Sequence, residues 1–154
     1  MDSEKERTFF LEALKEAHKA FKEGEVPVGC IITCEDKIIA RAHNRTESLN
    51  DPTAHAEIIA IGTAGTYLNN WRLTGCKMYV TLEPCLMCTG ALILSRIDEV
   101  VYLLEDPKFG VIESKLNLEN LMVFNHKFKV RKFQDEELKE EARKLLKAFF
   151  QKLR

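Results

Sequence analysis

Apolar residues recur at helical spacing in two long segments, one near each end of the chain. In residues 3–23 the apolar face consists of Phe10, Leu14, Ala17 and Phe21. In the segment that begins at Asp135 it consists of Leu138, Ala142, Leu145, Phe149 and Leu153. Such a stripe is typical of an amphipathic helix that packs one side against a core. The pattern therefore predicts an opening and a closing helix, with Gly24 ending the first.

Shorter runs of strand length lie between these two helices. We expect strands at residues 28–34, 37–43, 77–82, 99–104 and 127–133. The first two runs are joined by the sequence EDK, which begins at Glu35 and reads as a turn. The sequence therefore predicts a β-hairpin in the first third of the chain.

Two more helices are expected between the strands. One starts near Thr53, after a polar loop at residues 44–53, and runs to about Thr66, and the other follows Pro84. This order of elements predicts an α/β protein whose mixed sheet of about five strands has helices on both faces. Because no repeat or linker interrupts the sequence, we expect residues 1–154 to form a single domain.

The composition fits a globular protein in water. Apolar residues make up 45% of the chain and charged residues 31%, a balance that argues against disorder. No apolar run approaches the roughly 18 residues of a membrane-spanning helix. The start, MDSEKERTFF, mixes acidic and basic residues and has no apolar stretch of the kind found in signal peptides. We therefore expect a cytoplasmic protein without a membrane partner.

Charge and cysteine content narrow the chemistry further. The formal net charge is −1, which argues against a protein that coats nucleic acid without specificity. Residues 127–154 are nevertheless basic, with ten Lys/Arg against five Asp/Glu. The five cysteines are an odd number in a chain without a secretion signal. They therefore favour a metal site or buried thiols over a disulfide framework.

Two short sequences carry candidate metal ligands. In TAHAEIIA, which begins at Thr53, His55 and Glu57 are two residues apart, and a regular helix would place them on nearly opposite faces. At a first turn this rule is relaxed, because a capping residue is not yet helical. Both side chains can then face one cavity. In TLEPCLMC, Cys85 and Cys88 share a face near a helix N-terminus, where the helix dipole favours the thiolates that bind zinc.

One histidine and two cysteines leave the fourth position of a zinc ion free for water, which indicates a catalytic site. We therefore assign His55, Cys85 and Cys88 as the ligands of one Zn²⁺ per chain. Glu57 is assigned as the general base that takes a proton from this water and then returns it as a general acid.

Other interpretations of these residues stay open at this point. A single CxxC also occurs in thioredoxin-like redox proteins. His55 could be a capped or buried core histidine. The zinc could be structural, with a fourth ligand among Cys30, Cys34 and Cys76.

A resemblance extends over nearly the whole chain. Its motifs are EVPVG at Glu25, HNR at His43, DPTAHAE at Asp51, TLEPCLMC at Thr81, SRI at Ser95, NH at Asn125 and FF at Phe149. The pair H-x-E and P-C-x-x-C is the signature of zinc deaminases of nucleobases. On these motifs the chain resembles the cytidine deaminase superfamily and, within it, the bacterial tRNA-specific adenosine deaminases.

The resemblance implies a cytidine deaminase-like three-layer αβα fold and a homodimer. It implies hydrolytic deamination of adenosine to inosine at the wobble position of a tRNA anticodon, with attack at C6 of adenine and loss of ammonia. It places Asn44 in the pocket, where a side-chain amide both donates and accepts hydrogen bonds, and Val28 on the base face. The simpler roles for these two residues are a turn and a buried strand position.

The implied partner, a tRNA anticodon stem-loop, is bound by positive charge and aromatic faces. The resemblance implies that Phe149 and Phe150, at the basic C-terminal end, lie near the anticodon loop. Phe149 also falls on the apolar stripe of its helix, whereas Phe150 does not. Lys108, in the DPKFG turn, is a candidate phosphate contact, and Glu113 would bring an acidic group close to the RNA.

Two other functions share some of these features. A deaminase of a free nucleobase such as guanine or cytosine would carry the same HAE and PCxxC motifs, but it has no clear need for the basic C-terminal end. A non-catalytic, zinc-stabilised RNA-binding module would need no buried acid such as Glu57 beside the metal.

Overall fold

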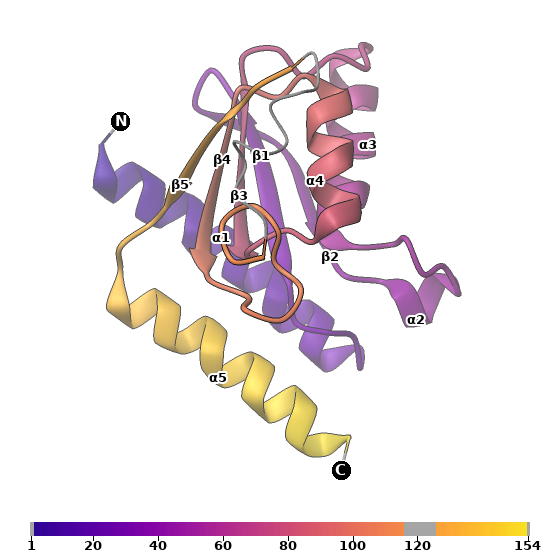
Figure 1. The fold of residues 1–154 in the computed structure, drawn as a ribbon, viewed down its shortest axis with the longest axis vertical. Coiled ribbons are helices and arrows are strands. Elements are labelled where there is room, and N and C mark those ends of the chain that lie inside the picture. The colour runs from indigo at the N-terminus through magenta and orange to yellow at the C-terminus, as the bar shows by residue number, and fades with distance from the viewer. Residues whose placement is uncertain (1, 116–125, 154) are drawn as a thin grey trace.

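Five strands form one mixed sheet in the computed structural model, which describes residues 2–115 and 126–153 (Figure 1). The strands are β1 (Gly29–Cys34), β2 (Lys37–His43), β3 (Cys76–Leu82), β4 (Glu99–Leu104) and β5 (Lys129–Lys132). Their order in the sheet is β2-β1-β3-β4-β5. The pairs β1–β2 and β1–β3 are antiparallel, whereas β3–β4 and β4–β5 are parallel. The predicted mixed sheet is confirmed.

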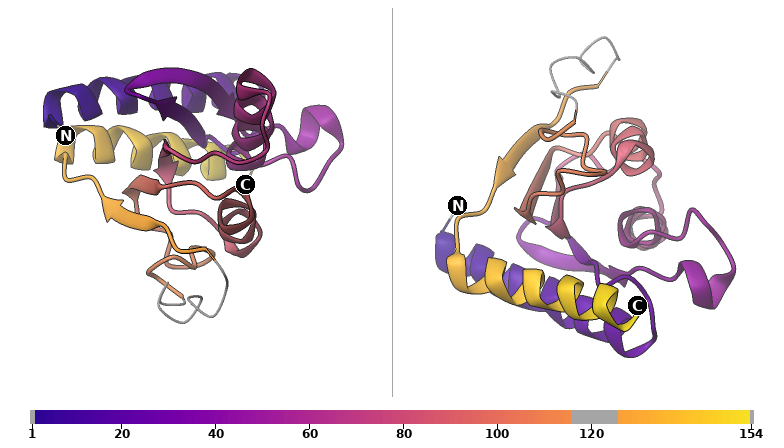
Figure 2. Two further views of the ribbon diagram at one scale, coloured as in Figure 1. Left: turned by 90° about the horizontal axis from the view of Figure 1, so that it is seen from above. Right: turned by 60° about the horizontal axis from the view of Figure 1, so that its bottom comes forward.

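Helices cover both faces of the sheet. On one face α1 (Ser3–Lys22) contacts α5 (Glu136–Lys152), and on the other α3 (Ala56–Leu68) contacts α4 (Leu86–Ser95). The two views in Figure 2 show the sheet between these pairs of helices. A single-turn helix, α2 (Thr46–Leu49), lies to one side of the layers. The predicted three-layer αβα fold is therefore confirmed.

Each helix layer has its own apolar core. Phe10 and Leu14 of α1 and Leu138 of α5 pack with Ile31 and Tyr79 of the sheet. On the opposite face the small side chains of Ala56, Ala60 and Ala64 let α3 lie close to the strands, where they share a core with Ile32 and Met78. Since side chains of a strand point alternately to its two faces, neighbouring residues such as Ile31 and Ile32 belong to different cores.

The predicted elements are present with small changes at their ends. The β1–β2 turn is tighter than expected, because Glu35 and Asp36 both have positive φ, 52° and 61°, and Lys37 already belongs to β2. Strand β5 is shorter than the predicted residues 127–133. The loop at residues 44–53 contains α2, which the sequence analysis missed. Four residues give too little periodicity for a helix to be recognised.

Some residues named from the sequence lie outside the described part of the chain. Asn125 of the Asn-His motif is among them, as are residues 116–124. No helix within the described residues combines the length and the apolar character that a membrane crossing requires.

Candidate active site

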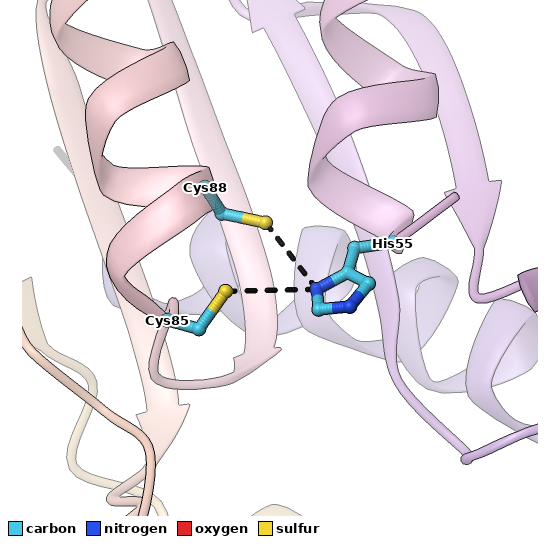
Figure 3. Close-up of side chains that lie close together, drawn as sticks. All are labelled: His55, Cys85 and Cys88. Carbon is cyan, nitrogen blue, oxygen red and sulfur yellow. Dashed lines mark hydrogen bonds between the residues drawn. The ribbon is translucent and has the colours of Figure 1, made fainter. Parts of the chain in front are cut away.

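The candidate zinc ligands lie at the N-termini of two neighbouring helices. His55 is the N-cap of α3, with φ −76° and ψ 154°, and Cys85 is the N-cap of α4, with φ −79° and ψ 179°. Both backbones are extended, so their side chains leave the chain outside the helical pattern. Cys88 follows in the first turn of α4. The chain thus brings ligands 30 residues apart to one place, where Figure 3 shows the two sulfurs facing the imidazole.

The distances between these side chains fit a zinc ion. The Sγ atoms of Cys85 and Cys88 each lie 3.6 Å from Nδ1 of His55. A tetrahedral zinc ion with bonds of roughly 2.3 Å to sulfur and roughly 2.0 Å to nitrogen would separate nitrogen from sulfur by about 3.5 Å. Two thiolates and an imidazole are also the donors that zinc prefers. Both the chemistry and the spacing of this donor set match the metal.

The other cysteines do not complete a structural site. Within the described residues, the group whose ligand atoms lie within 4.8 Å of one another comprises His55, Cys85 and Cys88 alone. The Cys30 thiol donates instead to the backbone oxygen of Ala56, 3.3 Å away. Cys34 and Cys76 are paired in register across β1 and β3, at the end of β3 opposite to Cys85. Three protein ligands leave a coordination position open for water.

The pKa values of the Cys85 and Cys88 thiols shift in opposite directions. The hydrogen bond with Cys88, and a second with His55, lowers the pKa of Cys85 to about 4, against the effect of burial. The same bond with Cys85, together with burial, raises the pKa of Cys88. The pair therefore holds one thiolate and one proton, and a divalent cation would displace that proton on binding.

Glu57 lies beside the ligand atoms in the first turn of α3. Its side chain is 4% exposed, and burial is the main cause that raises its pKa to about 7. The Cys85 and His55 charges and a hydrogen bond with Cys88 also act on this pKa, which places the carboxyl group next to all three candidate ligands. The spacing of two residues between His55 and Glu57 is thereby explained, since only Glu57 is helical.

Asn44 and Val28 lie together at the end of the β1–β2 hairpin. Asn44 is 6% exposed and Val28 is 8% exposed. The backbone N–H of Asn44 donates to the backbone oxygen of Val28 at 3.2 Å. The next amide, that of Arg45, donates to the backbone oxygen of Ala54 at 2.9 Å. Because Ala54 precedes His55, this bond ties Asn44 to the segment that carries the histidine.

Glu25 is a part of this region that the sequence analysis did not recognise. Its carboxylate is fully buried and accepts hydrogen bonds from the amides of Glu47 at 3.0 Å and Ser48 at 2.7 Å. Burial raises the pKa of Glu25, but these bonds outweigh it and lower the pKa overall. Glu25 therefore holds α2, and with it the loop between Asn44 and His55. An acid within the apolar EVPVG sequence was the available signal.

The predicted RNA contacts do not belong to the metal cluster. Lys108 is exposed in the loop after β4, with its Nζ 5.6 Å from the ring centre of Phe109. Phe149 is 9% exposed and Phe150 is 50% exposed, with their rings edge to face at 5.3 Å. Glu113 faces Tyr102, whose hydroxyl donates to its carboxylate.

Known proteins resemble this chain in sequence and in fold. Residues 3–104 match the family described as the cytidine and deoxycytidylate deaminase zinc-binding region. The chain belongs to this zinc-dependent deaminase family. A tRNA-specific adenosine deaminase of Aquifex aeolicus (strain VF5) is 49% identical over 149 residues, which are 96% of each chain. The resemblance to the tRNA-specific adenosine deaminases is thereby confirmed.

Solved structures place the deaminase in the same branch. A structure from studies of A-to-I editing by tRNA:A34 deaminases at the wobble position has a TM-score of 0.85 and 38% identity, covering 91% of this chain and 99% of that one. A guanine deaminase from Bacillus subtilis has a TM-score of 0.61 at the same 38% identity, but only 64% of either chain is covered. A guanine deaminase from Nitrosomonas europaea covers 92% of this chain with a TM-score of 0.75, but its 22% identity shows a shared fold alone. The tRNA enzyme combines high identity with nearly full coverage.

Proposed function

We propose that this protein hydrolyses adenosine to inosine at the wobble position of a tRNA anticodon. The observation that carries the proposal is the 49% identity with a tRNA-specific adenosine deaminase over 96% of both chains. The guanine deaminases, which represent the free-base alternative, match either only 64% of this chain or 92% of it at only 22% identity. Since its proposed substrate is a tRNA, we also propose that the protein acts in the cytoplasm, as one domain.

His55, Cys85 and Cys88 are the residues that would hold the zinc ion. When bound there, zinc supplies a Lewis acid that makes a water molecule acidic near neutral pH. Glu57 is the proton carrier: its carboxylate takes a proton from the attacking water and delivers it to the departing amino group. Burial raises the pKa of Glu57 toward the working pH, which is where a group that must both accept and donate a proton is most effective.

Asn44 and Val28 are proposed to orient the base. The Asn44 side chain can donate to one atom of the base or ribose and accept from another. The Val28 side chain offers an apolar contact to the face of the adenine ring. Their burial and their mutual backbone bond support a preformed pocket, which lowers the entropic cost of binding.

Lys108, Phe149 and Phe150 are proposed to contact the stem-loop. Phe150→Ala is expected to raise KM for an anticodon stem-loop about tenfold, since one base–aromatic stack contributes about 1–3 kcal/mol, and to leave the melting temperature unchanged. Phe149→Ala is the matched comparison, and it is expected to cost about 3 kcal/mol of folding free energy because the ring is buried. Steady-state kinetics of both variants gives KM, and thermal unfolding gives the change in folding free energy. An unchanged KM for Phe150→Ala would remove it from the RNA contacts.

A homodimer is proposed because α4 is apolar on both sides. One side packs in the core, while Leu86 and Leu94 on the other are 59% and 70% exposed. Leu49 of α2 and Phe109 are also exposed, at 46% and 63%, and apolar surfaces of this kind mark protein interfaces. Sedimentation equilibrium is expected to give twice the chain mass of 17.7 kDa, and a single-chain mass at micromolar concentration would overturn the dimer.

The proposed function is tested by conversion of adenosine in a short stem-loop with an ACG anticodon. We expect inosine to form, to disappear after chelator treatment and to return when zinc is added back. Free guanine and free cytosine, assayed in parallel, should not be deaminated. Turnover of a free base without turnover of RNA would overturn the substrate assignment. RNA binding without any turnover would instead indicate a non-catalytic module.

A further inference from the structure

The loop after β4 is attached to the zinc site through one buried carboxylate. Glu83 lies two residues before Cys85, and its side chain is 2% exposed. The backbone amides of Asp106, Glu113 and Ser114 donate to its oxygens at 3.1, 2.7 and 2.9 Å. The Ser114 hydroxyl donates as well, at 2.5 Å. Both ends of the loop at residues 106–114 therefore meet on a single side chain.

The backbone beside Glu83 holds the same loop. The Val111 amide donates to the Pro84 oxygen at 3.1 Å, and the Glu83 amide donates to the Leu104 oxygen at 2.9 Å. Gly110 lies so close that a Cβ atom there would be 2.5 Å from Cδ and Oε1 of Glu83. The loop packs directly against the carboxylate, so a side chain larger than glycine at position 110 would displace one or the other.

Lys108 and Phe109 are exposed on the outer side of this loop. Asp106 accepts hydrogen bonds at Oδ1 from the amides of Lys108 and Phe109, both at 3.1 Å. The turn with the exposed Lys108 and Phe109 side chains is thereby fixed to Asp106, and Asp106 is fixed to Glu83. A continuous path of hydrogen bonds connects the position of Lys108 to the strand end that leads into Cys85.

We propose that Glu83 is a positioning residue that holds the loop at residues 106–114 beside the zinc site and so sets the affinity for the RNA substrate. This inference rests on the proposed function. Glu83 is buried behind the loop and acts through the residues that it positions. Its replacement should therefore weaken substrate binding more than it slows the chemical step.

The test is the separate measurement of KM and kcat for Glu83→Gln with the ACG stem-loop. Glutamine keeps the shape of the side chain but replaces one carboxylate oxygen by an N–H₂ group. The loop donors that bond to that oxygen therefore lose their acceptor. We expect KM to rise about tenfold, because one loop amide loses its hydrogen bond to a charged acceptor. We expect kcat to stay within about threefold and zinc to stay bound, because no candidate ligand is changed. The loss of a negative charge would by itself lower KM, because RNA is an anion and would be repelled less.

Glu105→Gln is the matched control for charge. Glu105 precedes Asp106 but is exposed, and its carboxylate pairs with Lys132. We expect its KM to be unchanged or slightly lower. Lys108→Ala, made alone and together with Glu83→Gln, shows whether the two changes act on the same contact. In that case the double variant should raise KM less than the product of the two single effects.

Gly110→Ala provides a second way to displace the loop if Glu83→Gln does not fold. Its methyl group would lie 2.5 Å from the Glu83 carboxylate and 2.6 Å from the backbone oxygen of Asp106, and we expect KM to rise as for Glu83→Gln. Loss of zinc, a lower kcat at constant KM, or an unchanged KM in both variants would overturn the inference. Failure of the unaltered protein to convert the stem-loop would overturn the proposed function instead.

Discussion

Replacement of Glu57 by glutamine is expected to lower kcat for the stem-loop by about 10³-fold while the zinc stays bound, because the side chain can no longer carry a proton. Glutamine fills the same space as the buried glutamate, so the site should keep its shape. The effect should appear in single-turnover measurements, which report the chemical step alone. Metal analysis of the same sample gives the zinc content.

The matched control is Glu99→Gln, which also neutralises a buried acid. Glu99 is 8% exposed and accepts from Arg131, at the end of β4 opposite to the zinc site. We expect it to lose some stability and to keep its kcat. Full activity of Glu57→Gln would exclude Glu57 as the proton carrier. Loss of zinc together with activity would show that Glu57 supports the metal site instead.

Cys85→Ser is expected to remove both zinc and activity. A serine hydroxyl does not ionise near neutral pH, so it cannot replace the Cys85 thiolate, whose pKa is lowered to about 4. Since metal binding stabilises the folded state, the melting temperature should also fall, by about 5 °C. Zinc content, thermal unfolding and stem-loop turnover, measured on one preparation, test all three effects.

Cys34→Ser is the control for the loss of a thiol. Cys34 is half-buried and lies at the far end of the sheet from Cys85. We expect this variant to bind one zinc ion per chain and to turn over normally. A Cys85→Ser protein with zinc at full occupancy would show that Cys85 is not a ligand. Together with Glu57→Gln, the experiment separates a residue that binds the metal from one that moves the proton.

Residue spacing and residue type are enough to predict the fold class and the chemistry of the zinc site. Periods of 3.6 and 2 residues follow directly from helix and strand geometry, so the long helices and the strands could be assigned from apolar spacing. The candidate zinc ligands and Glu57 belong to two short motifs, HAE and PCxxC, in which the chemistry depends on residue type and local spacing. The extended backbone of His55 confirms that this residue precedes its helix. Cys85 is expected on the helix with Cys88, but its extended backbone makes it the N-cap instead.

The side chains that hold the surrounding loops could not be predicted from the sequence and are identified by the folded arrangement. Glu83 and Ser114 are 31 residues apart, and no periodicity links a buried acid to the amides that it accepts from. The same applies to Glu25 and α2, whose four residues are fixed by a carboxylate 23 residues earlier. Contacts of this kind arise from the folded arrangement of distant segments, and a local pattern does not encode them.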